Sequence, residues 1–144
     1  MGLLKEGSVL SNRFRIEKRI SRGENTEVYR CFDITQNQHC ALKILGSQAG
    51  QARIQRFKKE FQELHNLRHP FLITTYDFAE EPSLGYYFTC ELINGVPVTK
   101  KFKKFHPEQV IPLMIQICQI FKFLHSRSII HADLEPSSLM VIEV

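Results

Sequence analysis

Lys43, Glu60 and Asp133 are the side chains of this 144-residue chain with the clearest capacity for chemistry. Lys43 ends the apolar run Cys40-Ala41-Leu42, where an unpaired ammonium group would be costly to bury. Asp133 follows an apolar stretch that ends at Ile130, and it could either accept a proton from a hydroxyl group or cap a turn. A fixed cation and a positioned base are what phosphoryl transfer to a hydroxyl requires from a protein.

The helical pattern around Glu60 suggests a partner for Lys43. In an α-helix each residue advances by about 100°, which places the apolar centre of this segment near Phe57 and Leu64. Glu60 then lies only about 60° from that centre, whereas Glu63 lies about 120° away on the solvent side. A carboxylate near the buried face needs a cation, so we predict a Lys43–Glu60 ion pair. The alternative is a rim glutamate that bonds to solvent or to Arg56.

The hydrophobic pattern places strands on both sides of this helix. Residues 51–67 have helical spacing, and His69-Pro70 ends the helix because the residue before a proline disfavours the α region. A second, longer helix starts near Pro107 and reaches about Ser126, with a linker and a short helix at residues 93–106 before it. Apolar alternation predicts strands at residues 14–20, 27–33, 39–45, 73–79 and 86–92.

Motifs along these segments resemble, in order, the first half of a bacterial-style Ser/Thr protein kinase domain. Cys40-Ala41-Leu42-Lys43 is similar to the V-A-I-K motif, and His131-Ala-Asp-Leu-Glu-Pro-Ser-Ser-Leu-Met140 is similar to the catalytic loop H-R-D-L-K-P-x-N-L-L. The resemblance implies an α+β, protein-kinase-like fold. Residues 1–93 would form a five-stranded antiparallel small lobe with one inserted helix, and residues 94–144 the hinge, helices and catalytic-loop segment of an incomplete large lobe.

This resemblance also implies roles for individual residues. Lys43 would bind the α- and β-phosphates of ATP and pair with Glu60, and Asp133 would orient the substrate hydroxyl. Ser138 stands where the family has a magnesium-binding asparagine, and its hydroxyl is a poorer ligand than an amide oxygen. The residues implied to bind the nucleotide are Ile20, Gly23, Val28, Ala41, Lys43, Cys90, Glu91, Ile93 and Met140.

The same motifs depart from the family pattern at several positions. Ala132 replaces the arginine of the catalytic loop, and Glu135 replaces its lysine, which exchanges attraction to the γ-phosphate for repulsion. The glycine-rich loop matches the family pattern only at Gly23 and Val28 and carries Glu24, and no Asp-Phe-Gly occurs in the sequence. We therefore expect this chain alone to be inactive as a kinase unless a full large lobe completes it. The alternatives are a pseudokinase that binds a regulatory partner and a small-molecule phosphotransferase.

Composition indicates a globular protein. The hydrophobic fraction is 43%, the charged fraction 24% and the net charge +4, and the densest basic run, Lys100 to Lys104, is interpreted as a solvated helix face rather than a nucleic-acid site. The four cysteines form no Cys-x-x-Cys pair, which favours buried thiols in the cytoplasm. We expect ATP and a protein substrate or regulatory protein as partners, with no membrane. The apolar long helix, if left uncovered, would drive self-association.

Overall fold

The computed structural model describes residues 2–101, 105–130 and 139–142. Internal contacts divide the chain into two units. The first comprises residues 1–68 and 73–92, and the second comprises residues 69–72 and 93–144.

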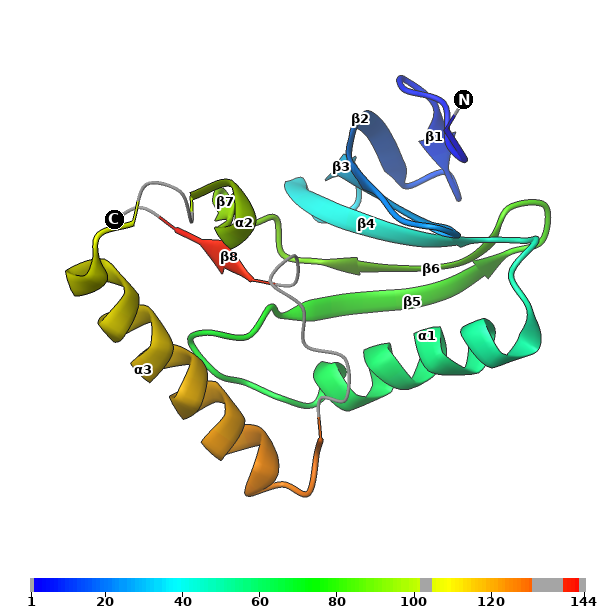
Figure 1. Cartoon of the computed structure of the whole chain (residues 1–144). Coiled ribbons are helices and arrows are strands. Elements are labelled where there is room, and N and C mark those ends of the chain that lie inside the picture. The colour runs from blue at the N-terminus through cyan, green and yellow to red at the C-terminus, as the bar shows by residue number, and fades with distance from the viewer. Residues whose placement is uncertain (1, 102–104, 131–138, 143–144) are drawn as a thin grey trace. The chain divides into compact units, whose positions relative to one another are not determined.

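The first unit is an antiparallel sheet with one inserted helix, α1 (Figure 1). The spatial order of its strands is β1-β2-β3-β4-β6-β5, and α1 lies between β4 and β5 in the chain. This confirms the predicted α+β class and adds β1 to the five expected strands. The strands are β1 (Val9–Leu10), β2 (Phe14–Arg22), β3 (Thr26–Asp33), β4 (Gln38–Gly46), β5 (Thr75–Glu81) and β6 (Gly85–Cys90).

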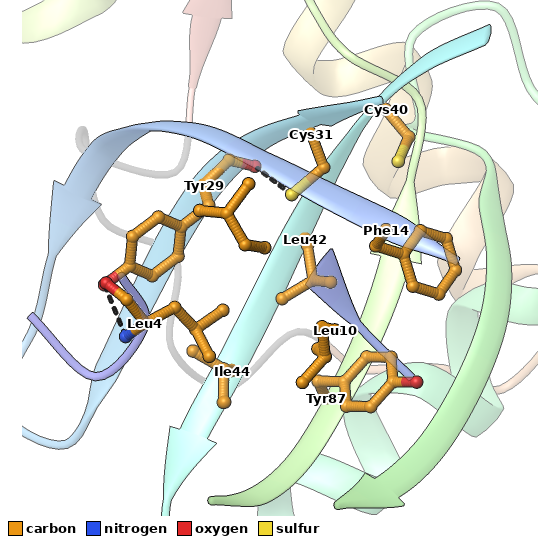
Figure 2. Packing of buried hydrophobic residues seen from close by; sticks show 10 residues of the cluster. Leu4, Leu10, Phe14, Tyr29, Cys31, Cys40, Leu42, Ile44 and Tyr87 are labelled. Atoms are coloured by element: carbon orange, nitrogen blue, oxygen red, sulfur yellow. Dashed lines mark hydrogen bonds between the residues drawn. The ribbon is translucent and has the colours of Figure 1, made fainter. Parts of the chain in front are cut away.

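One face of the sheet carries the main core. Side chains alternate between the two faces of a strand, so Leu42 and Ile44 of β4 point to the same side as Tyr29 of β3. Figure 2 shows these side chains packed with Phe14 of β2 and Tyr87 of β6. All five are nearly inaccessible to solvent, and their burial is the main favourable contribution to folding of this unit.

Helix α1 (Gln51–His65) packs on the other side through its apolar stripe. Phe57 is its most buried residue and contacts the Phe88 ring of β6, with the ring centroids 5.1 Å apart. Ile54 and Phe61 lie partly buried beside it, as the helical spacing predicts. The helix ends at His65, four residues before the His69-Pro70 dipeptide that was expected to stop it.

The second unit contains β7 (Val96–Pro97), α2 (Val98–Lys101), α3 (Pro107–His125) and β8 (Met140–Val141). Strands β7 and β8 pair in antiparallel fashion, and the Val98 N–H donates to the Leu139 carbonyl at 2.9 Å. The Phe123 ring of α3 packs against His69 at a centroid distance of 4.8 Å. Pro107 occupies the first turn of α3, as predicted.

The exposed side of α3 differs from the sequence expectation. A thin polar stripe was expected, but Ile111, Met114 and Ile115 are also more than half exposed. Cys118 lies on the same side and is exposed, so the prediction of four buried thiols is wrong for this one residue. When a helix is apolar on most sides, its sequence does not specify which side neighbouring elements cover. None of the helices in the described ranges combines the length and apolar character that crossing a bilayer requires.

Candidate nucleotide-binding site

Several of the predicted nucleotide-binding residues share one face of the first unit's sheet. Lys43 of β4 is directly opposite Val28 of β3 on one side and Phe88 of β6 on the other. Ala41, two residues before Lys43, is directly opposite Cys90. Because directly opposed residues lie on the same face, the register gathers Val28, Ala41, Lys43 and Cys90 there, opposite to the main core.

The predicted ion pair between Lys43 and Glu60 is present. The Lys43 ammonium donates to both carboxylate oxygens of Glu60, at 2.9 and 3.1 Å. Two adjacent aromatic rings lie near the ammonium, those of Phe57 at 5.9 Å and Phe88 at 5.8 Å from Nζ to the centroid. The side chains of Lys43 and Glu60 remain 28% and 40% exposed. The lysine is therefore held in place and still accessible to an anionic ligand.

The turn between β2 and β3 is the counterpart of the glycine-rich loop. The Gly23 N–H donates to the Thr26 carbonyl at 2.7 Å, which closes the turn. A side chain at position 23 would bring its Cβ to within 2.7 Å of Thr26 Oγ1, so the tight turn favours glycine there. Glu24 forms an ion pair with Arg53 of α1. Ile20 precedes the turn on β2 and is about half exposed.

Cys90 and Glu91 lie where β6 ends. The Glu91 N–H donates to the Thr74 carbonyl at 2.9 Å, and its carboxylate accepts the Thr74 N–H at 3.0 Å. A nucleotide that contacts the Glu91 backbone would therefore meet its carbonyl rather than its N–H. Burial raises the pKa of the Cys90 thiol to about 12, so this side chain acts as a small neutral group and not as a nucleophile.

The other predicted site residues lie outside the first unit. Ile93 and Met140 belong to the second unit, where Met140 is opposite Pro97 in the β7–β8 pair. Asp133 and Ser138 lie outside the described residues, as do Ala132 and Glu135. Within the ranges that the structure describes, no group of three or more His, Cys, Asp or Glu side chains is placed to hold a metal ion.

Two features of the site were missed by the sequence analysis. The aromatic pair Phe57 and Phe88 frames the lysine, and the strand register could have indicated Phe88, since it lies two residues before Cys90. The Glu24–Arg53 pair joins residues 29 positions apart, and no spacing rule links a turn to the first turns of a later helix. Only the folded chain brings these two charges together.

Known proteins match the chain over nearly its whole length. Serine/threonine-protein kinase PrkC of Bacillus subtilis is 29% identical over 140 residues, which is 94% of this chain and 22% of that protein. Serine/threonine-protein kinase PknB of Mycobacterium leprae is 29% identical over 140 residues, 92% of this chain and 22% of that protein. Serine/threonine-protein kinase PknA of Mycobacterium tuberculosis is 25% identical over 144 residues, 94% of this chain and 33% of that protein.

This chain therefore spans between about a fifth and a third of the length of these bacterial relatives. A family model described as the protein kinase domain matches residues 14–143, which include the Lys43–Glu60 pair, the turn at Gly23 and the His131 to Met140 segment. The chain belongs to the protein kinase domain family, of the bacterial Ser/Thr type.

Proposed function

We propose that this chain binds ATP and forms the nucleotide-binding part of a Ser/Thr protein kinase domain. The observation that carries the proposal is the accessible Lys43 ammonium, held by Glu60 on the same sheet face as Val28, Ala41 and Cys90. A fixed cation beside a small apolar surface suits a ligand with phosphates at one end and a flat ring at the other.

The proposed contacts combine this arrangement with the roles that the family resemblance implies for Ile93, Met140 and Ser138. Lys43 would neutralise the α- and β-phosphates, Val28 and Ala41 would cover one face of the adenine, and Met140 would support the other. The Glu91 carbonyl and the Ile93 N–H would bond to the adenine edge, with Cys90 as the gatekeeper residue behind it. Ile20 and Gly23 would lie over the ribose and phosphates. Magnesium would enter with the ATP phosphates and has Ser138 as its one proposed protein ligand.

A thermal-shift titration with ATP, with and without magnesium, tests nucleotide binding directly. A ligand that binds only the native state raises the melting temperature in a saturable way. We expect such a rise for this chain and its loss in Lys43→Ala. The control is Lys59→Ala on α1, which removes an exposed lysine that pairs only at 3.6 Å with Glu63. No shift in the unmodified chain, or an equal shift in Lys43→Ala, would refute ATP binding at this site.

Phosphoryl transfer is a further step of the proposal. Asp133 would orient the hydroxyl of a protein substrate and accept its proton, in a protein that has a full large lobe. Glu135 and Ser138 favour the alternative of a pseudokinase that uses the same fold to bind a regulatory partner, because both weaken the catalytic loop's attraction for phosphate and metal. Phosphate transfer by a longer protein containing this chain, lost in Asp133→Asn, would exclude the alternative.

Self-association through α3 is a separate proposal. Ile111, Ile115 and Cys118 form an exposed apolar stripe, with Glu108 near its start and Lys122 near its end. Glu108 and Lys122 each lie seven residues from Ile115, about two helical turns, so they flank it on one side of the helix. A second copy running antiparallel would place each Glu108 beside the other copy's Lys122. We therefore assign this stripe to a second copy of the chain.

A further inference from the structure

The N-terminal segment, residues 2–8, is bound to the core side of the first unit's sheet. The Leu4 N–H donates to the Tyr29 hydroxyl at 3.1 Å, as Figure 2 shows, and the Leu4 side chain is buried in the main core. The Gly7 N–H donates to the Ile16 carbonyl at 2.8 Å. A side chain at Gly2 would collide with the Tyr29 hydroxyl, with its Cβ only 2.6 Å away. The segment is thus a fitted part of the fold.

A single buried carboxylate connects this segment to the nucleotide-binding hairpin. Glu27 lies on β3 directly before Val28, and only 4% of its surface is exposed. Its Oε2 accepts the Leu3 N–H at 2.7 Å and also the Tyr29 hydroxyl. Its Oε1 faces Arg19 Nη1 at 3.3 Å and Arg22 Nε at 3.7 Å. Glu27 therefore links the N-terminal segment to both strands of the hairpin.

The partners of Glu27 are sufficient to keep it charged. Burial alone would raise the pKa of its carboxyl group, but the hydrogen bonds from Tyr29 and Leu3 and the charges of Arg19 and Arg22 outweigh burial and lower the pKa. Hydrogen bonds to an ionised acceptor are stronger than neutral ones, so the link is an energetically significant one. Removing the Leu3 donor would leave part of a buried charge unsatisfied.

Among the described residues, the nucleotide-binding turn is also anchored at Asn25, whose carbonyl accepts the Gly46 N–H at 2.9 Å. Residues 18–24 are all exposed, and the Glu24 side chain that pairs with Arg53 is itself 76% exposed. Exposed ion pairs hold a loop weakly. Val28 lies on the sheet face that would bind the nucleotide, and Glu27, its neighbour on β3, lies on the opposite face. Glu27 and Val28 are adjacent on β3, so an interaction that holds Glu27 acts directly beside the residue that would reach the adenine.

We propose that Glu27, held by the N-terminal segment, is a positioning residue that sets the conformation of the turn at residues 23–25 and so the affinity for ATP. The second half of this proposal rests on the proposed ATP binding, whereas the first half does not. Displacing residues 2–8 would remove the contacts that hold Glu27 on the core side of the sheet. The turn would then become more mobile, although the residues that face the nucleotide are unchanged. The segment would then couple changes at the N-terminus to nucleotide affinity.

Amide hydrogen exchange in the absence of nucleotide tests the first half. The variants are Glu27→Gln, which keeps the shape but removes the charge, Tyr29→Phe, which removes one donor, and a deletion of residues 2–7. The control is Glu17→Gln, which breaks an ion pair with Arg30 elsewhere on the same hairpin. We expect exchange at residues 20–28 to accelerate at least about tenfold in Glu27→Gln and in the deletion, less in Tyr29→Phe, and not in the control.

The second half is tested by ATP titration of the same proteins. We expect Glu27→Gln to weaken ATP binding at least about fivefold while Glu17→Gln leaves it unchanged. Unchanged exchange at residues 20–28 in a folded Glu27→Gln protein would overturn the proposal, and so would faster exchange with unaltered ATP affinity. If the unmodified chain fails to bind ATP, the proposed function falls, and the exchange data still decide whether Glu27 holds the turn. Should the deletion fail to fold, Glu27→Gln and Tyr29→Phe decide alone.

Discussion

The ion pair between Lys43 and Glu60 is partly exposed to solvent, and this exposure limits its contribution to stability. Both side chains retain substantial exposure, at 28% and 40%. Ion pairs in such surroundings contribute about 0–1 kcal/mol to stability. The pair therefore matters through the position it gives to the ammonium group, and its loss should be visible in ligand affinity far more than in folding.

Substituting Glu60 separates these two effects. In Glu60→Gln we expect a melting temperature within about 4 °C of the unmodified chain, because a pair worth under about 1 kcal/mol is lost. We expect ATP binding to weaken markedly, because Lys43 is no longer held beside the rings of Phe57 and Phe88. Glu63→Gln on the same helix is the matched control and should change neither quantity. Unaltered ATP affinity in Glu60→Gln would contradict the positioning role.

Asp33 carries a buried carboxylate, and its hydrogen-bond partners make the stability of the fold depend on pH in the acid range. Arg13 donates to both of its oxygens, at 2.9 and 2.7 Å, and the Thr35 and Gln36 N–H groups donate as well. The hydrogen bond from Arg13 is the largest cause that lowers the pKa of Asp33 below its ordinary 3.8, and it outweighs the opposing effect of burial. The stability that this carboxylate contributes is therefore present above about pH 4 and is lost as the pH falls through its lower, folded-state pKa.

Replacing Asp33 tests this sign. We expect Asp33→Asn to be less stable than the unmodified chain at pH 7, and the difference in unfolding free energy to shrink as the pH falls below about 4. Asp77→Asn is the control, because Asp77 contacts the same Arg13 at 2.9 Å but is half exposed. Urea denaturation across this pH range measures both. A difference between Asp33→Asn and the unmodified chain that stayed constant with pH would show that the Asp33 charge is not responsible.

At the scale of the elements, regular periodicity decided what could be predicted. The longer strands and both long helices have enough residues to show a period, and the predicted apolar stripe of α1 is the one that packs on Phe88. Strands β1, β7 and β8 have two residues each and carry no period. The binding of the N-terminal segment was also not predictable, because a backbone N–H that meets Glu27 leaves no trace in the pattern of side chains.

Phe57 connects the packing of α1 to the site. Its ring is 4% exposed and lies between the helix and Phe88, close to the Lys43 ammonium. We expect Phe57→Ala to reduce the free energy of unfolding by about 3–5 kcal/mol, because it leaves a cavity at the centre of the helix–sheet contact. Chemical denaturation measures the loss, with the exposed Gln55→Ala as control. A loss under about 1 kcal/mol would mean that α1 is held mainly by other contacts.

At the scale of the whole molecule, the order of motifs identified the family more securely than any single motif did. The turn at Gly23 keeps one glycine of the family pattern, yet its place before Lys43, Glu60 and the hinge was enough to indicate the fold. The structure gathers Lys43, Glu60, Val28, Ala41 and Cys90 within the first unit. The chemistry proposed for Asp133 depends on residues 131–138, which lie outside the described ranges, so that part of the site remains a prediction from sequence.

The exposed stripe of α3 leads to a prediction about the assembly of the molecule. Ile111 and Ile115 are 63% and 54% exposed. Covering apolar side chains on one helix face with another apolar surface removes them from water, which is favourable. An antiparallel second copy would cover Ile115 with its own counterpart and pair Glu108 with Lys122 at both ends. One helix-on-helix contact is small, so we expect a weak dimer with a dissociation constant above about 1 µM.

Light scattering at increasing protein concentration measures this association. We expect the mass to rise from one copy to two for the unmodified chain, and Ile115→Glu to stay monomeric because it buries charge at the centre of the contact. Gln116→Glu adds the same charge away from that centre and should still associate. Glu108→Lys should weaken the dimer, and the double exchange Glu108→Lys with Lys122→Glu should restore it, since opposite charges face each other again. A constant monomer mass, or an exchange that restores nothing, would show that a second copy does not occupy this stripe.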